Sequence, residues 1–229
     1  MHPIIVKLGP FTIYSYGLML ALAFITSSML AVSGGKRKGI SPDIIFNLVF
    51  IGFISGIIGA RFFYVIENIS YYLKYPLEIV MLQQGGLSWF GGLIAGVLSG
   101  LIYLKRKKAA VYKVLDLISP YVALAQGIGR VGCLLNGCCF GRAFIPIQVY
   151  SSLSLLLIFI ILRCLQERPH REGEIFFSYL ILYCTKRFFI EFWRLDNPVI
   201  FLRLTLFQII SIVILILSLT KLLLLKKSK

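Results

Sequence analysis

The chain has 229 residues, of which 59% are hydrophobic and only 14% charged, yet its formal net charge is +15. Soluble domains carry about 45–50% apolar and about 25% charged residues, so these numbers exclude a soluble nucleic-acid-binding protein, and disordered chains are much poorer in apolar residues. Because a membrane-spanning helix needs about 20 apolar residues, the composition predicts a polytopic α-helical membrane protein with no nucleic-acid partner.

Seven apolar runs, each bounded by polar residues, are long enough to cross a bilayer. In chain order they cover residues 14–32, 44–66, 87–104, 114–135, 147–165, 175–192 and 204–225. The fourth run is the least hydrophobic, since it contains Asp116, Gln126 and Arg130. The sequence shows no repeat and no separate soluble segment. We therefore predict the all-α class, with one transmembrane domain over residues 1–229.

Basic residues gather after every second predicted span. They are Lys36, Arg37 and Lys38; Lys105, Arg106, Lys107, Lys108 and Lys113; Arg163, Arg168 and Arg171; and Lys221, Lys226, Lys227 and Lys229. With seven spans all of them lie on one side of the membrane, which the positive-inside rule makes the cytoplasm. The N-terminus is then outside and the C-terminus cytoplasmic. The longest external segment, residues 67–86, is rich in tyrosine and is predicted to lie along the membrane interface.

The remaining basic residues fall in the outer halves of spans or in external loops, where the positive-inside rule disfavours them. They are Lys7, Arg61, Lys74, Arg130, Arg142, Lys186, Arg187, Arg194 and Arg203. Glu191 lies four residues after Arg187 and three before Arg194, so these three share one helix face. A single carboxylate among several arginines leaves an excess of positive charge, and guanidinium groups suit bidentate contact with an anion such as phosphate. Any one arginine could instead extend to the interface, but the group together favours an anion site.

Glycines cluster in the same parts of the sequence, before the third run and around Arg130. Two explanations are open. Glycines in membrane helices often allow close helix packing. They also permit irregular backbone beside a cavity, with N–H groups directed at an anion. A phospholipid headgroup would fit such a site.

Several short motifs, occurring in a fixed order along the chain, are the basis of a resemblance to a known family. They are Tyr14-Ser15-Tyr16-Gly17-Leu18-Met19; Gly59-Ala60-Arg61 with Tyr64; Gly85-Gly86-Leu87-Ser88 with Gly91-Gly92; Asp116 with Pro120; Gly129-Arg130-Val131-Gly132 with Asn136-Gly137; Pro146 with Gln148 and Tyr150; and Arg187-Phe188 with Glu191-Phe192 and Arg194. With this set the chain resembles the phosphatidylglycerol–prolipoprotein diacylglyceryl transferases nearly from end to end.

The resemblance implies a reaction and a set of residue roles. The thiol of a lipobox cysteine attacks the diacylglyceryl group of phosphatidylglycerol, which forms a thioether and releases glycerol phosphate. Arg130 and Arg187 would hold the phosphate and stabilise the charge on the leaving group. Tyr16 would orient the headgroup, and Glu191 would belong to the catalytic set. The implied substrate-binding residues are Arg61, Tyr64, Ser88, Gly129, Asn136 and Arg194.

The resemblance also implies partners and a location. The partners are phosphatidylglycerol, the signal peptide of a preprolipoprotein and membrane lipids, with no cofactor and no metal. The enzyme would be a multi-pass protein of the bacterial cytoplasmic (inner) membrane, with its active site toward the outer face.

Several positions depart from the family pattern. A histidine is usual where Phe90 stands, an asparagine at Cys133, a histidine at Ile145, a glutamate at Ser151 and a glycine at Phe207. Three interpretations are open. In a divergent transferase, Glu191, a tyrosine or the phosphate itself would take the thiol proton. A paralogue would bind an anionic phospholipid headgroup but act on another acceptor. A transporter or non-catalytic lipid-binding protein fits less well, because the polar residues cluster at one end of the spans.

The sequence also contains five cysteines, whose thiols could be reactive. Cys164 and Cys184 lie in apolar runs and are expected to pack as small hydrophobic residues. The spacing of Cys133, Cys138 and Cys139 matches no standard zinc motif and no histidine is near in the sequence. We therefore expect packing or a loop disulfide, with Cys133 the preferred partner, rather than a redox or acyl-carrying role for Cys138 or Cys139.

Overall fold

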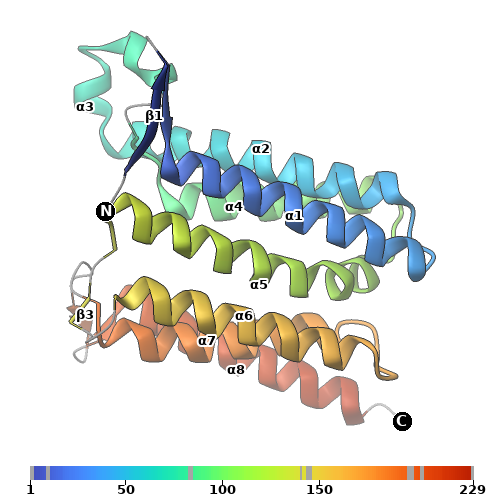
Figure 1. Cartoon of the computed structure of the whole chain (residues 1–229). Coiled ribbons are helices and arrows are strands. Elements are labelled where there is room, and N and C mark those ends of the chain that lie inside the picture. Colours follow the sequence, from blue (N-terminus) through green and yellow to red (C-terminus); the bar gives the residue numbers. More distant parts are fainter. Residues whose placement is uncertain are drawn as a thin grey trace. The chain divides into compact units, whose positions relative to one another are not determined.

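The computed structural model describes residues 3–8, 11–81, 85–139, 141–142, 146–194, 199–201 and 204–227. Its helices are α1 (Ser15–Arg37), α2 (Pro42–Glu67), α3 (Ile69–Tyr72), the 3-10 helix η1 (Pro76–Val80), α4 (Trp89–Arg106), α5 (Val111–Asn136), α6 (Ile147–Gln166), α7 (Glu174–Glu191) and α8 (Leu206–Lys227). Each predicted run overlaps one of the seven long helices (Figure 1). The helical fold is thus confirmed, with boundaries shifted by a few residues.

Short strands are the part of the fold that the sequence analysis missed. Strands β1 (Ile4–Leu8) and β2 (Phe11–Tyr14) pair antiparallel, with Ile4 opposite Tyr14. Strands β3 (Val199–Phe201) and β4 (Leu204–Thr205) form a second small hairpin before α8. Both hairpins are rich in β-branched and aromatic residues, but strands of two to five residues are too short to show a clear alternating pattern.

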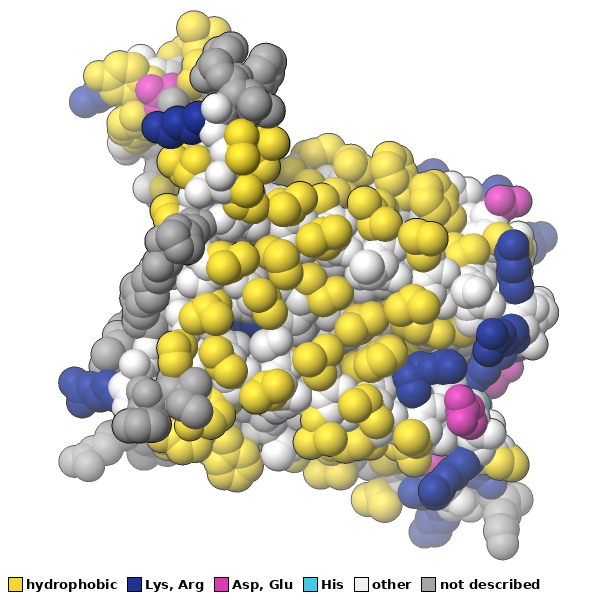
Figure 2. Space-filling view, viewed as in Figure 1, with side chains coloured by type: hydrophobic (Ala, Val, Ile, Leu, Met, Phe, Trp, Pro, Cys, Tyr) yellow, Lys and Arg dark blue, Asp and Glu magenta, His cyan; other side chains and the backbone are white. Residues whose placement is uncertain are grey.

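Five of the long helices are apolar and long enough to cross a membrane: α1, α2, α5, α6 and α8. Helices α4 and α7 have 18 residues each. The apolar character of α7 is interrupted by Lys186, Arg187 and Glu191, while α4 carries four glycines and ends in Lys105 and Arg106. Figure 2 shows apolar side chains along the outer surfaces of the helices, as expected where they meet lipid.

The chain divides into two compact units, residues 1–34 with 112–229 (the first unit) and residues 35–111 (the second unit). In the second unit α2 and α4 pack antiparallel, with Gly52 against Gly96 and Gly56 against Gly92. A Cβ at Gly59 would collide with the backbone of α4. These glycines therefore serve close helix packing, the first of the two explanations left open by the sequence. Gly85 and Gly86, which precede α4, have φ of +82° and +77° and line a cavity, as the second explanation expects.

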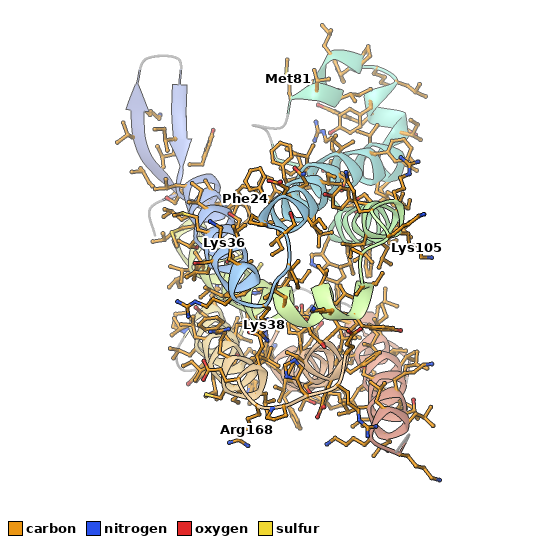
Figure 3. All side chains as sticks on the ribbon, turned by 90° about the vertical axis from the view of Figure 1, so that its right-hand side faces the viewer. Phe24, Lys36, Lys38, Met81, Lys105 and Arg168 are labelled. Carbon is orange, nitrogen blue, oxygen red and sulfur yellow. The ribbon has the colours of Figure 1, made fainter. Side chains whose placement is uncertain are left out.

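The antiparallel arrangement brings basic residues to one end of the second unit. Lys36 and Lys38 lie just before the start of α2, and Lys105 lies at the end of α4 (Figure 3). Because α2 and α4 run in opposite directions, these two positions are at the same end.

In the first unit, α5 contacts both α1 and α6. Gly132 of α5 packs against Met19 and Tyr16 of α1. On the other side, the Ser152 hydroxyl of α6 donates to the Gly127 carbonyl oxygen at 2.9 Å. Helix α7 packs against both α6 and α8. Helix α5 therefore links the start of α1 to the remaining helices of this unit.

The buried Asp116 of α5 ties that helix to the start of α7. Its carboxylate accepts the Gly173 N–H at 2.6 Å and the Phe176 N–H at 2.8 Å. Gly173 precedes the first turn of α7 and has no side chain with which to cap it. Asp116 therefore satisfies N–H groups that a helix start leaves without partners.

Replacing Asp116 with alanine is expected to destabilise the protein by roughly 1–3 kcal/mol, because buried N–H groups lose their acceptor. The thermal unfolding midpoint in detergent micelles measures this effect. Asp43→Ala is the matched control, since Asp43 is exposed in the first turn of α2. Equal shifts in the two variants would contradict the capping role of Asp116.

Candidate functional site

Four basic side chains and one carboxylate gather in the first unit. Arg187 and Glu191 lie in the last turns of α7, and Arg194 follows its end. Lys186 of α7 is within electrostatic range of Arg130, Arg187 and Arg194. Helix α5 supplies Arg130. We call Arg130, Lys186, Arg187, Arg194 and Glu191 the arginine cluster.

Glu191 organises this cluster. Its Oε2 lies 3.1 Å from Arg187 Nη2 and 4.0 Å from Arg194 Nε. Its Oε1 accepts a hydrogen bond from the Thr205 hydroxyl at 3.0 Å, and the carboxylate is fully buried. The predicted shared face of Arg187, Glu191 and Arg194 is confirmed.

The Thr205 that contacts Glu191 is itself fixed by α8. Gln208 Oε1 accepts the Thr205 N–H at 2.9 Å, and the Gln208 side chain is buried. The Arg187 guanidinium also lies over the Phe207 ring, 4.4 Å from its centroid. The start of α8 thus holds both members of the Arg187–Glu191 pair.

Arg130 differs from its neighbours. Within the described part of the chain its guanidinium has no ion pair and no side-chain hydrogen bond, although it is half-buried. A Cβ on the adjacent Gly129 would meet nothing within 4 Å, so there is open space beside it. With respect to the residues that the structure describes, the Arg130 donors are therefore available for an anion.

Lys186 has polar but uncharged partners. Its Nζ donates to the Ser151 hydroxyl at 3.0 Å and lies 5.2 Å from the centre of the Tyr183 ring. Ser151 stands where the family pattern has a glutamate, so this lysine faces a neutral residue. Three guanidinium groups against one carboxylate leave the arginine cluster positive.

The chain after α5 folds back on that helix. Gly137 adopts φ +71°, and the Cys138 N–H donates to the Cys133 carbonyl oxygen at 3.1 Å. This is a Schellman ending, in which a left-handed residue lets the following residue contact the last turn of the helix. The two residues that such an ending brings together are here both cysteines.

Cys139 joins the same pair, so that the three thiol sulfurs lie within 4.8 Å of one another. Cys139 is in the left-handed region at φ +63°, and its Sγ is 3.7 Å from Cys138 Sγ. The hydrogen bond with Cys133 lowers the pKa of the Cys139 thiol, while burial raises that of Cys138. The three residues are free cysteines, so the expected loop disulfide is absent among these described residues.

Polar residues from other helices reach this cysteine cluster (Cys133, Cys138 and Cys139). The buried Gln148 of α6 donates from Nε2 to the Cys138 carbonyl oxygen at 2.6 Å. Tyr16 of α1 is within electrostatic range of Arg130 and of all three thiols.

Charges of the arginine cluster reach the cysteine cluster, since Arg130 and Arg194 are within electrostatic range of Cys139. The chain around the cysteines is held locally: Asn136 hydrogen-bonds to the Cys138 thiol, and Gly141 forms a backbone bridge with Arg194. The arginine and cysteine clusters are therefore neighbours at one end of the first unit.

The predicted residues Arg61, Tyr64 and Ser88 lie in the second unit. Arg61 donates all five of its N–H groups to backbone carbonyl oxygens, those of Glu78, Ile79, Met81, Gly85 and Gly86. Its guanidinium is thus used to hold the loop between α3 and α4, which leaves it no N–H group for a headgroup. Direct substrate binding by Arg61 does not follow from this geometry.

Tyr64 and Ser88 lie close to Arg61. The Arg61 guanidinium is 5.9 Å from the centre of the Tyr64 ring. The Ser88 hydroxyl donates to Glu67 Oε1 at 3.1 Å, and the Ser88 N–H donates to the Ala60 carbonyl oxygen. Substrate contact by either residue stays a prediction.

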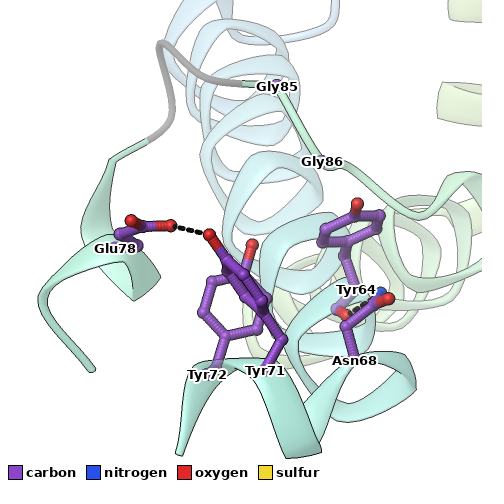
Figure 4. A pocket seen from close by; sticks show the side chains of 7 residues that line it. All are labelled: Tyr64, Asn68, Tyr71, Tyr72, Glu78, Gly85 and Gly86. Atoms are coloured by element: carbon purple, nitrogen blue, oxygen red, sulfur yellow. Dashed lines mark hydrogen bonds between the residues drawn. The ribbon is translucent and has the colours of Figure 1, made fainter. Parts of the chain in front are cut away.

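A cavity of about 330 Å³ opens beside this loop (Figure 4). It is lined by Tyr64, Asn68, Tyr71, Tyr72, Glu78, Gly85 and Gly86. The Tyr71 hydroxyl donates to Glu78 Oε2 at 2.7 Å, and this bond raises the pKa of Tyr71. The short helices α3 and η1 expose Leu73 and Leu77, consistent with the predicted interfacial position of this segment.

The sequence analysis named no site role for several residues that the fold places here. Lys186 was noted only as a basic residue, and Thr205 and Gln208 lie in or beside the short hairpin that was not predicted. Their roles depend on contacts between helices, for which a single sequence gives no signal. The cysteine spacing gave a partial signal that the Schellman ending explains.

The family model described as prolipoprotein diacylglyceryl transferase matches residues 3–224. A phosphatidylglycerol–prolipoprotein diacylglyceryl transferase of Clostridium tetani is 34% identical over 216 residues, which cover 86% of each chain. The protein of that name from Bacillus licheniformis is 33% identical, over 94% of this chain and 89% of its own. The one from Streptococcus pyogenes is 35% identical, over 96% and 93%.

Proposed function

This chain belongs to the prolipoprotein diacylglyceryl transferase family, and from that premise we propose that its arginine cluster holds the phosphate of phosphatidylglycerol during transfer. The protein is a membrane-bound transferase that moves the diacylglyceryl group of this lipid to a prolipoprotein. The acceptor is the thiol of the lipobox cysteine. A carbon–sulfur bond forms as the carbon–oxygen bond to the phosphate breaks, and glycerol phosphate leaves with the electron pair.

The main support for the proposal is the Arg130 guanidinium, which has no hydrogen-bond partner among the described residues and lies near the other basic side chains of the arginine cluster. As the carbon–oxygen bond breaks, negative charge grows on the phosphate, so fixed donors around it stabilise the transition state more than the bound lipid. Arg130 and Arg187 supply planar donor pairs that match phosphate oxygens. Lys186 adds a further N–H donor beside them, a residue to which the sequence analysis assigned no site role.

Glu191 has a positioning role in this proposal. It aligns Arg187 with Arg194 and is held by Thr205, so the guanidinium groups are oriented before the lipid enters. Tyr16 lies next to the same charges and is proposed to orient the headgroup. Gly129 leaves room for it, and Asn136 acts by holding the chain after α5.

For the membrane arrangement we propose seven spans in a single transmembrane domain, with the N-terminus outside and the C-terminus in the cytoplasm of a bacterial cell. The basic last turns of α1, α4 and α8 support this orientation. The arginine cluster, built at the end of α7 and near the end of α5, then faces the outer side of the cytoplasmic membrane. The lipid and the signal peptide of the preprolipoprotein are the proposed partners there.

Complementation tests the function. A host depleted of its own transferase is expected to survive when it expresses this chain, and its lipoproteins should carry a diacylglyceryl group by mass spectrometry. Arg163→Ala, at an ion pair between half-buried Arg163 of α6 and exposed Glu167, should complement equally well. Death of the host with the folded protein present in its membrane would reject the proposed acceptor and leave a lipid-binding paralogue.

A further inference from the structure

Binding of the lipid phosphate requires no thiol, yet three cysteine thiols lie together at the end of α5. We propose that Cys133, Cys138 and Cys139 bind one Zn²⁺ ion, whose fourth position takes up the lipobox thiol as a thiolate. This inference rests on the proposed function, and it adds a metal that the sequence analysis did not expect.

The geometry of the cysteine cluster suits a zinc ion. A tetrahedral site with zinc–sulfur bonds of about 2.3 Å places its sulfurs about 3.8 Å apart. Cys138 Sγ and Cys139 Sγ are 3.7 Å apart, and the three sulfurs lie within 4.8 Å of one another. Small side-chain rotations therefore bring all three to bonding distance of one ion.

The cluster is also held from outside. The Schellman ending fixes Cys138 against Cys133, and the buried Gln148 binds the Cys138 carbonyl oxygen. Metal sites depend on such outer contacts to hold their ligands in place. Packing alone would not need three sulfurs, a left-handed Cys139 and a buried amide at one point.

The surrounding charge favours this occupant. Three thiolates and one Zn²⁺ carry a net negative charge, which becomes more negative when a fourth thiolate binds. Arg130 and Arg194 are within electrostatic range of Cys139 and offset that charge. A fourth protein ligand is not needed, because catalytic zinc sites keep one open position for substrate.

The inferred ion would also replace a missing base. Phe90 stands where the family pattern has a histidine and cannot accept a proton. The described part of the chain contains one histidine, His170, which follows the C-terminal end of α6. Gln148, which contacts the cysteine cluster, lies at the opposite end of that helix, so His170 is not near the thiols. A metal-bound thiol is deprotonated outright, so coordination would supply the nucleophile without a histidine.

In the proposed step, the lipobox thiol first binds the zinc ion and releases its proton to water. Its sulfur then uses one electron pair to bond the diacylglyceryl carbon, while the carbon–oxygen electron pair leaves on glycerol phosphate beside Arg130. The product thioether is a weaker metal ligand than a thiolate, which favours its release. No oxidant or reductant is consumed.

Metal content is the first test. The full-length protein, purified with a non-thiol reductant, is expected to hold about one zinc per chain, with three sulfur neighbours by X-ray absorption. Serine variants of Cys133, Cys138 and Cys139 should each lose most of it, whereas Cys164→Ser in α6 should keep it. Zinc retained in all three variants, or zinc absent from the reduced wild-type protein, overturns the site.

Cobalt substitution tests the fourth position without measuring transfer. Co²⁺ in the site should give thiolate-to-metal charge-transfer absorption, which rises when a lipobox peptide with its cysteine is added. The same peptide with serine should leave the spectrum unchanged. Equal spectra with both peptides overturn the uptake of the substrate thiol.

The pH profile separates activation from a structural metal. A free thiol with a pKa of about 8.5 is only about 3% ionised at pH 7, so removing zinc should lower turnover roughly 30-fold there. The loss should shrink toward pH 9, where the free thiol ionises unaided. A loss that is the same at both pH values indicates a structural ion and overturns activation. Zinc binding with no transfer in either state would instead reject the proposed function and keep the three-thiolate site.

Discussion

Arg130→Ala and Arg187→Ala are each expected to lower the rate of diacylglyceryl transfer by a factor of about 10²–10³. This is the usual effect of removing one fixed donor from a site that stabilises a growing negative charge. The rate is measured with phosphatidylglycerol and a lipobox peptide in detergent or nanodiscs. Because the charge grows during the reaction, turnover should fall more than the apparent affinity for lipid.

The two variants differ in what else they disturb. Arg130 has no ion pair within the described structure, so its loss should leave the unfolding midpoint nearly unchanged. Arg187 is paired with Glu191 and stacked on Phe207, so its loss should lower both turnover and stability. Arg187→Lys keeps the charge but loses the planar donor pair, and an intermediate rate is expected.

Arg163→Ala is the matched control. Arg163 pairs with the exposed Glu167 at the C-terminal end of α6, whereas the N-terminal end of that helix contacts the cysteine cluster. Normal turnover in both Arg130→Ala and Arg187→Ala would refute the phosphate-binding role of the arginine cluster. It would do so even if the chain complemented a depleted host.

Glu191→Gln is expected to cost both stability and activity. The neutral amide leaves the buried side chains of Arg187 and Arg194 without their shared carboxylate, and breaking a buried ion pair in this way costs about 3–5 kcal/mol. In a chain of this size such a loss lowers the unfolding midpoint by roughly 10 °C. Turnover should fall as well, because the guanidinium groups are no longer aligned.

A second substitution tests the cause of that loss. Adding Arg194→Gln to Glu191→Gln removes one uncompensated charge, so the double variant should be more stable than the sum of the two single effects predicts. Glu167→Gln, whose side chain is 74% exposed, is the control and should change stability by less than about 1 kcal/mol. Simple additivity of the two buried substitutions would contradict a shared network.

Most of the fold was predictable from the sequence. The long helices follow from apolar runs of spanning length, since lipid leaves backbone groups no partner outside a helix. The β1–β2 hairpin was missed because four or five residues are too few for a period to show. The glycines around the start of α4 fitted two explanations, and the structure divides them: Gly91 and Gly92 pack against α2, whereas Gly85 and Gly86 form irregular backbone beside a cavity.

The candidate site was predictable only where its residues share one element. Arg187, Glu191 and Arg194 lie three and four residues apart, so helical geometry alone places them together. Arg61 looked equivalent to Arg130 in the sequence, since both are arginines beside glycines in outer halves of spans. The tertiary structure separates them, because backbone carbonyls saturate Arg61, whereas no hydrogen bond to the Arg130 side chain is found among the described residues.

The sequence by itself determined a membrane protein of long helices, a family resemblance and an excess of arginines in a few of those helices, and it predicted an orientation for them. Each of these depends on composition or on spacing within one helix, which a linear pattern records. Only the tertiary structure decided which charges meet, which arginine stays available, and that three cysteines converge beside them. Those outcomes depend on how separate helices pack and on the left-handed turn at Gly137, and the spacing of residues along one helix does not record distances between helices.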